Sequence, residues 1–211
     1  MAGHGLGTVL MLPGRAYSCE RPLLAATTRA LRTAGWTVLQ ASWDLPAVPA
    51  EPREFVEAAA RGLDAAERPT GPVLVVAKSL GTLAAHWAAD RGYPAVWLTP
   101  VLRAVGRHPL PAHCDALAER LRDYPTDSLV VGGTADALWE KGFHSTGTVL
   151  EIDGADHGLE VADPRATRRH HEDVASWVSD LARTVRGSAA PIGMADTHVV
   201  ARHSKESSRE R

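Results

Sequence analysis

Three residues of types that together catalyse acyl transfer lie in separate parts of the chain. Ser79, Asp136 and His157 each follow a short apolar run. Such runs predict β-strands, which places each of the three residues just beyond the C-terminal end of a strand. In open parallel sheets that edge is where ligand sites form. The three side chains are therefore expected to meet at one edge of a sheet.

The chemistry of a reactive serine requires this combination. A serine hydroxyl is a poor nucleophile until a neutral imidazole removes its proton during attack. A carboxylate then fixes the imidazole tautomer and stabilises the imidazolium that forms. A lone Asp after a strand, such as Asp136, is usually a turn or helix cap, and a lone His in a loop, such as His157, is usually solvated. Only their joint occurrence, in the order Ser79, Asp136, His157, favours catalysis.

The residues around Ser79 predict a sharp strand-to-helix turn. The segment 72–85 reads P-V-L-V-V-A-K-S-L-G-T-L-A-A, with small residues at Ala77 and Gly81 on either side of the serine. A turn that exposes a nucleophilic serine needs small residues there, because it brings backbone segments close together. Ala77 stands where glycine is usual. An ordinary strand–turn–helix junction is the alternative interpretation.

Acyl transfer by serine also needs two N–H donors for the developing oxyanion. The backbone N–H of Leu80, the residue after the serine, is the first candidate. The second is expected from the loop after the N-terminal strand, which reads P-G-R-A-Y, and is assigned to Arg15 or its neighbour Ala16. A plain turn is the alternative for this loop.

Three carboxylates lie near His157 in the sequence, and their positions favour Asp136 as its partner. Asp156 is adjacent to His157, and adjacent side chains seldom reach the geometry of a carboxylate–imidazole bond. Asp153 is expected to cap its own turn through Gly154. Asp136 belongs to the neighbouring strand, and we expect it to contact His157 Nδ1 at about 2.6–3.2 Å.

From residue 8 to 186 the chain resembles the α/β-hydrolase superfamily, and more closely its small members without a lid. The resemblance rests on the segments L-P-G-R-A-Y, G-W-T-V-L-Q-A-S-W-D-L-P, A-K-S-L-G-T-L-A-A, A-V-W-L-T-P, V-G-G-T-A-D-A-L-W and D-G-A-D-H-G-L. Lys78 matches a K-S-x-G subgroup. The resemblance implies a serine hydrolase that cleaves an ester or thioester. An acyltransferase, a non-hydrolytic biosynthetic catalyst and a non-catalytic binding or scaffold protein stay open as alternatives.

Short apolar runs alternate with amphipathic segments, which predicts an α/β fold with a mostly parallel sheet of about six strands and helices on both faces. A single domain is expected over residues 1–186, with a disordered tail over 187–211. The span 100–127 is too short for a cap domain. Strands are expected at 8–13, 36–43, 72–78, 95–99, 128–132 and 148–152, and helices at 20–34, 51–67, 79–91, 113–124 and 167–185.

Composition excludes several classes of partner. The chain has 211 residues, of which 45% are hydrophobic and 23% charged, with a formal charge of −2. That charge gives no reason to expect a nucleic-acid or anionic membrane partner. No run approaches membrane-spanning length, and no signal peptide is expected, because residues 1–7 lack the basic start and apolar stretch of one. Cys19 and Cys114 have no metal or redox spacing and are expected to be reduced, in the cytoplasm.

No cofactor or metal is expected. Adjacent helical residues such as His170 and His171 point about 100° apart, so one ion would not contact both. Substrate contacts are assigned to Tyr17 and Trp139 near strand ends. Ordinary packing is the alternative for both, as it is for Trp43 and Trp97. Lys78 is interpreted as a structural residue that points away from the substrate, with a carboxylate as a candidate partner.

Overall fold

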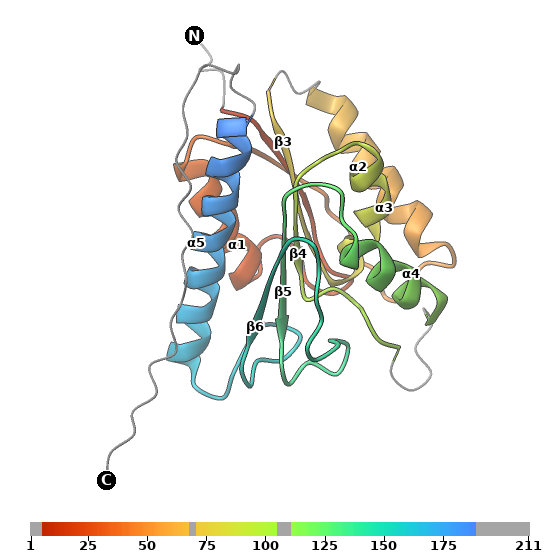
Figure 1. Cartoon of the computed structure of the whole chain (residues 1–211), viewed down its shortest axis with the longest axis vertical. Coiled ribbons are helices and arrows are strands. Elements are labelled where there is room, and N and C mark those ends of the chain that lie inside the picture. Colours follow the sequence, from red (N-terminus) through yellow and green to blue (C-terminus); the bar gives the residue numbers. More distant parts are fainter. Residues whose placement is uncertain (1–5, 68–70, 105–110, 189–211) are drawn as a thin grey trace.

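The protein forms one sheet of six parallel strands, shown in Figure 1 in a computed structural model that describes residues 6–67, 71–104 and 111–188. The order across the sheet is β2-β1-β3-β4-β5-β6. The strands are β1 (Thr8–Leu12), β2 (Thr37–Gln40), β3 (Val73–Lys78), β4 (Ala95–Leu98), β5 (Ser128–Gly133) and β6 (Thr148–Ile152). Every strand pair is parallel. The predicted fold class is therefore confirmed.

The central strands are apolar along their whole length because both faces of the sheet are covered. Every residue of β1, β3, β4 and β5 is buried. Continuous runs such as V-L-V-V-A in β3 are typical of parallel strands with helices on both sides. The edge strand β6 is mostly exposed or half-buried, and it contains the polar residues Thr148 and Glu151.

The helices form two layers (Figure 1). Helices α1 (Pro22–Thr33) and α5 (Pro164–Ser188) pack on one face. The other face carries α2 (Pro52–Glu67), the 3₁₀ helix η1 (Ser79–Ala84), α3 (Ala85–Asp90) and α4 (Pro111–Arg122). Two hydrophobic clusters fill the spaces between these layers and the sheet. Helices α1, α2, α4 and α5 each begin with proline, whose fixed φ and missing N–H suit the first helical position.

The segment after Ser79 differs from the single helix predicted for residues 79–91. It begins as the 3₁₀ helix η1 and continues as the short α-helix α3. The close contact of Gly81 with the loop after β1, described below, tightens this first turn. Helix α5 also continues to Ser188, two residues into the predicted tail. The rest of that predicted tail, residues 189–211, lies outside the described residues.

The strand order places the loops after β1 and β3 side by side. The chain passes from β1 to β2 on one side and then to β3 on the other, and this reversal opens a crevice at the C-terminal edge. The register pairs Leu12 with Ala77, so the two strands end level with each other. Within the described residues, no cap domain lies between β4 and β5: the segment contains the loop 99–104 and α4.

Candidate active site

Ser79 sits in a strained backbone conformation directly after β3. Its φ is +51°, in the left-handed region that residues with a Cβ rarely adopt. The carbonyl of Ser79 accepts a hydrogen bond from Thr82 Oγ1 at 2.6 Å, which helps to hold the turn closed. The strand-to-helix turn predicted around Ser79 is therefore present, and it directs the hydroxyl toward the C-terminal edge of the sheet.

Gly81 explains why the turn needs a residue without a side chain. A Cβ at this position would lie 2.6 Å from the carbonyl oxygen of Leu12 and 2.7 Å from that of Pro13. The N–H of Gly81 donates to the Pro13 carbonyl at 3.1 Å. The turn is thus bonded directly to the loop after β1. Ala77, on the other side of Ser79, is fully buried within β3.

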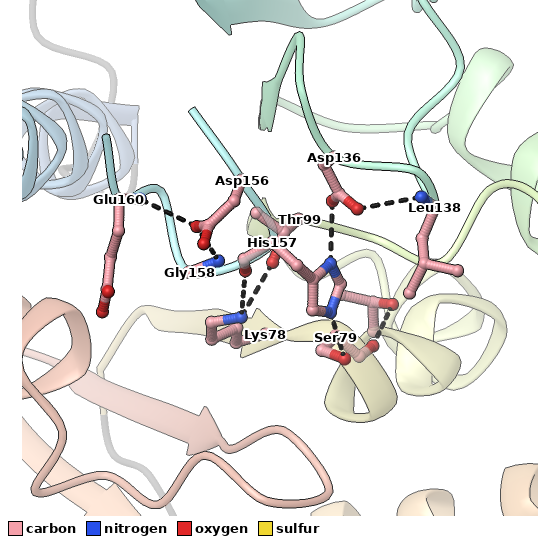
Figure 2. Close-up of polar contacts among 10 residues, drawn as sticks. Lys78, Ser79, Thr99, Asp136, Leu138, Asp156, His157, Gly158 and Glu160 are labelled. Atoms are coloured by element: carbon pink, nitrogen blue, oxygen red, sulfur yellow. Dashed lines mark hydrogen bonds and ion pairs between the residues drawn. The ribbon is translucent and has the colours of Figure 1, made fainter. Parts of the chain in front are cut away.

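His157 joins Ser79 and Asp136 in one chain of hydrogen bonds (Figure 2). Nε2 of the imidazole lies 2.8 Å from Ser79 Oγ, and Nδ1 lies 2.7 Å from Asp136 Oδ2. A neutral imidazole with its proton on Nδ1 satisfies both contacts: it donates to the carboxylate and accepts from the hydroxyl. The hydrogen bond predicted between Asp136 and His157 is confirmed.

The surroundings of Asp136 fix its carboxylate. The side chain is 1% exposed, and Oδ1 accepts the backbone N–H of Leu138 at 2.8 Å. The His157 ring, by contrast, is 33% exposed. A buried, oriented carboxylate therefore holds an imidazole that solvent and substrate can reach.

The other two carboxylates near His157 have different partners. Asp156 Oδ1 accepts the backbone N–H groups of Gly158 and Glu160 and shapes the loop itself. Asp153 accepts a hydrogen bond from Thr134 Oγ1. The cap predicted between Asp153 and Gly154 is wrong, since the N–H of Gly154 donates to Thr134 Oγ1.

The candidate oxyanion donors lie around the serine. Leu80 is the second residue of η1, so no preceding turn provides a carbonyl for its N–H. Arg15 and Ala16 follow Gly14 in the loop after β1, and both line the cavity beside Ser79. Neither backbone N–H of this pair donates to another described residue. Both predicted alternatives for the second donor thus fit this geometry.

A cavity of about 300 Å³ opens beside the serine. Its apolar walls come from the loops at the C-terminal edge, and Ser79 and His157 contribute polar groups. The lining residues are Gly14, Arg15, Ala16, Tyr17, Val48, Lys78, Ser79, Leu80, Val101, Leu138, His157 and Gly158. Tyr17 was predicted as a substrate contact, and its position in the lining fits that assignment.

Trp139, the second predicted substrate contact, is not among the lining residues. Its side chain is 1% exposed, and its Nε1–H donates to Glu151 Oε1 at 2.6 Å. The indole occupies the space above Gly132, where a Cβ would lie 2.2 Å from it. The turn that aims the Asp136 carboxylate directs Trp139 inward, and Leu138 takes the place beside the cavity. The substrate contact predicted for Trp139 is therefore wrong, and the alternative, ordinary packing in the core, is observed.

Lys78 was interpreted as structural, and its position is more specific than the sequence indicated. Its side chain is 1% exposed, and Nζ donates to the backbone carbonyl of His157 at 2.8 Å and to Thr99 Oγ1 at 3.0 Å. No carboxylate lies within ion-pair distance among the described residues, so the suggested carboxylate partner is wrong. A lysine that ends an otherwise apolar strand is a signal of burial, but its partners come from two distant loops.

Cys19 and Cys114 are free and buried. Burial raises the pKa of the Cys19 thiol to about 12, which disfavours the thiolate that a nucleophile requires. On α5, Nε2 of His171 lies 3.2 Å from the carbonyl of Gly158, so it contacts the loop that carries His157. None of the described helices combines the length and apolar character needed to cross a membrane.

No protein-family model matches the sequence, and no curated protein matches it either. Solved structures do match the fold. Est1E from Butyrivibrio proteoclasticus, solved with ferulic acid bound, is 13% identical with a TM-score of 0.67, over 88% of this chain and 92% of its own.

Two further similar structures have comparable coverage. The esterase Pf2001 from Pyrococcus furiosus is 15% identical, with a TM-score of 0.60 over 87% of this chain and 84% of its own. The α/β hydrolase domain-containing protein 10 from mouse is 13% identical, with a TM-score of 0.56 over 84% of this chain and 90% of its own.

Proposed function

We propose that this protein of α/β-hydrolase fold is a serine hydrolase that cleaves an ester or thioester of a small molecule through an acyl-enzyme. The observation that carries the proposal is the hydrogen-bonded series Ser79–His157–Asp136 at the wall of a cavity. The esterases among the similar structures support it.

In the acylation step, Ser79 Oγ attacks the carbonyl carbon of the substrate while its proton passes to His157 Nε2. The resulting oxyanion is stabilised by the N–H of Leu80 and that of Arg15 or Ala16. Collapse of the tetrahedral intermediate breaks the bond to the leaving alcohol or thiol, which takes the proton from His157. The acyl group stays on Ser79.

Deacylation repeats these steps with water. His157 removes a proton from a water molecule as that water attacks the acyl carbon, and the proton returns to Ser79 Oγ when the acid leaves. Asp136 remains ionised and stabilises the imidazolium in both halves. Every step uses groups of the chain and water, so the proposed reaction needs no cofactor.

The cavity favours a small acyl or alcohol group. Its volume of about 300 Å³ lies at the lower end of the range for ligand pockets. Val48, Val101 and Leu138 make much of its wall apolar, which suits a short hydrocarbon chain or a ring. We place the reaction in the cytoplasm, where thiols such as the free Cys19 and Cys114 stay reduced.

Covalent labelling with a fluorophosphonate probe tests the proposal. We expect a single adduct on Ser79, located by peptide mass spectrometry, and none in Ser79→Ala. A panel of p-nitrophenyl esters and acyl thioesters of increasing chain length then defines the substrate. An adduct on another serine, or unchanged turnover by Ser79→Ala, would contradict the assignment.

A further inference from the structure

Lys78 presents a physical problem that the proposed mechanism does not use. A fully buried ammonium group costs a large desolvation energy unless a countercharge lies beside it. Lys78 has no carboxylate partner among the described residues, and its two acceptors are the neutral oxygens of Thr99 and His157. An apolar residue of similar size would avoid this desolvation cost.

Lys78 contacts residues of the candidate active site. It is the residue before Ser79, and its ammonium group binds the backbone carbonyl of His157 (Figure 2). The same group lies 4.5 Å from the ring centroid of Tyr17, which lines the cavity. Lys78 thus connects the main chain of the candidate base to that of the candidate nucleophile.

The second acceptor, Thr99, is itself held in place. It follows β4 with a φ of +41°, and its backbone N–H donates to the backbone carbonyl of Val131 at 2.7 Å. It is fully buried. The hydroxyl therefore offers a fixed second contact for Lys78 Nζ, which leaves that group little freedom to leave the His157 carbonyl.

We propose that Lys78 is a positioning residue, whose ammonium group holds the main chain of His157 so that the imidazole faces Ser79. The inference rests on the proposed function. Asp136 orients the ring from Nδ1, and Lys78 fixes the backbone from which the ring projects. The neighbouring residues of the loop are held by Asp156 and by His171, but Lys78 is the side chain that binds the carbonyl of His157 itself.

Protonation of Lys78 is part of this role. Burial lowers the pKa of Lys78 to about 8. This effect is larger than the attraction of Asp136, Asp156 and Glu160, which raises the pKa. The charged form is present below that value, so activity should fall as the pH rises through about 8. The charged and titratable groups around Lys78 come from the loops after β1, β5 and β6 and from α5: Tyr17, Asp136, Asp156, His157, Glu160 and His171. Arg21 lies over the ring of Tyr17.

Lys78→Met is the informative variant, because it keeps an unbranched side chain, one atom shorter, and removes the charge and the donors. We expect kcat and the rate of fluorophosphonate labelling at Ser79 to fall about 10- to 100-fold, as expected for a misplaced catalytic group. KM should stay within about twofold. The melting temperature should change little, because relief of the desolvation cost offsets the loss of the two hydrogen bonds. A purely structural lysine would give a clearly lower melting temperature and unchanged kcat.

Thr99→Val is the matched control. It removes one contact of Lys78 and leaves the bond to His157, so the loss of labelling rate should be under about threefold. The pH profile separates the two variants further. Wild type and Thr99→Val should lose labelling rate above about pH 8, and Lys78→Met should lack that step. A wild-type profile with no alkaline step that Lys78→Met lacks would contradict a role for the charge.

Amide hydrogen exchange tests the proposal independently of catalysis. Lys78→Met should speed exchange in the loop of residues 156–160, whereas Thr99→Val should change it little. If the probe does not label wild-type Ser79, the proposed function fails, and exchange alone decides the role of Lys78. Exchange equal to wild type in Lys78→Met, or labelling within about twofold of wild type, would overturn the proposal.

Discussion

The two edges of the sheet solve the same backbone problem with different residues. At the edge where strands begin, the turns before β2 and β4 need a positive φ and have glycine, at Gly35 and Gly92. At the edge where strands end, glycine has this role at Gly154, but Ser79, Thr99 and Leu159 adopt positive φ values despite their side chains. Each of these conformations costs about 1–3 kcal/mol.

The difference shows which residues of the fold lower its stability. The strained residues carry the candidate nucleophile, hold Lys78 or anchor the loop of His157, and the buried charge of Lys78 lies at the same edge. The turns before β2 and β4 have no such strained residue. Changes to the strained residues and to the groups that they contact should therefore affect activity, and changes in the buried core near the other edge should affect stability.

Asp136→Asn should have the largest effect on turnover. The amide can still accept the N–H of Leu138, so folding is preserved, but it stabilises the wrong tautomer of His157 and no longer balances the imidazolium. We expect kcat to fall by about three to four orders of magnitude, measured with a p-nitrophenyl ester. Asp153→Asn, at the neighbouring strand end, is the control and should retain wild-type turnover.

Leu31→Ala tests the other edge. Leu31 lies in the last turn of α1, is fully buried, and belongs to the hydrophobic cluster beneath α1 and α5. Loss of its side chain should lower the free energy of unfolding by about 2–5 kcal/mol, measured by urea denaturation. The folded fraction should keep its labelling rate at Ser79. Leu31→Met, which nearly conserves volume, should cost less than about 1.5 kcal/mol. A slowed reaction in folded Leu31→Ala would break the division between the edges.

Gly81→Ala should affect both properties, because Gly81 joins the serine turn to the loop after β1. The added Cβ must displace backbone oxygens of Leu12 and Pro13, which shifts the candidate oxyanion donors. We expect about a 10- to 100-fold loss of labelling rate together with lower stability. Gly62→Ala is the control: nothing lies within 4 Å of its added Cβ in α2, and stability should rise by about 0.5–1 kcal/mol.

The smallest expected effect is the most direct measure of strain. Ser79→Gly and Ser79→Ala are both expected to be inactive, but glycine tolerates a φ of +51° and alanine does not. Ser79→Gly should therefore be more stable by about 0.5–1 kcal/mol. At Gly62, within a helix, the order of the same two residues is reversed. If Ser79→Gly were instead less stable than Ser79→Ala by the difference measured at Gly62, the turn would store no strain.

Much of the site follows from local sequence patterns. The apolar runs locate the strand ends, and parallel strands bring the residues that follow them to one edge, so Ser79, Asp136 and His157 could be placed together. The choice of Asp136 over Asp153 followed from the positions of neighbouring strands. The K-S-x-G subgroup and the catalytic roles stay predictions.

The features that sequence reasoning missed depend on side-chain direction within turns. Trp139 follows a predicted strand end, as Tyr17 does, yet its turn directs the indole into the core. Lys78 was expected near a carboxylate because a buried cation usually needs one, whereas its acceptors lie at the ends of β4 and β6. The 3₁₀ start of the helix after Ser79 depends on backbone crowding around Gly81. None of these leaves a periodic signal.

The division of the site along the chain has a consequence for folding. Residues up to Thr99 provide the serine, the candidate oxyanion donors and Lys78, whereas the carboxylate and the imidazole lie in the loops after the last two strands. The serine therefore gains its base only when β5 and β6 have joined the sheet and α5 has docked on α1. During synthesis on the ribosome, a nascent chain should stay unreactive toward the probe until this late stage. Adduct formation at Ser79 would then time the docking of the final third of the protein.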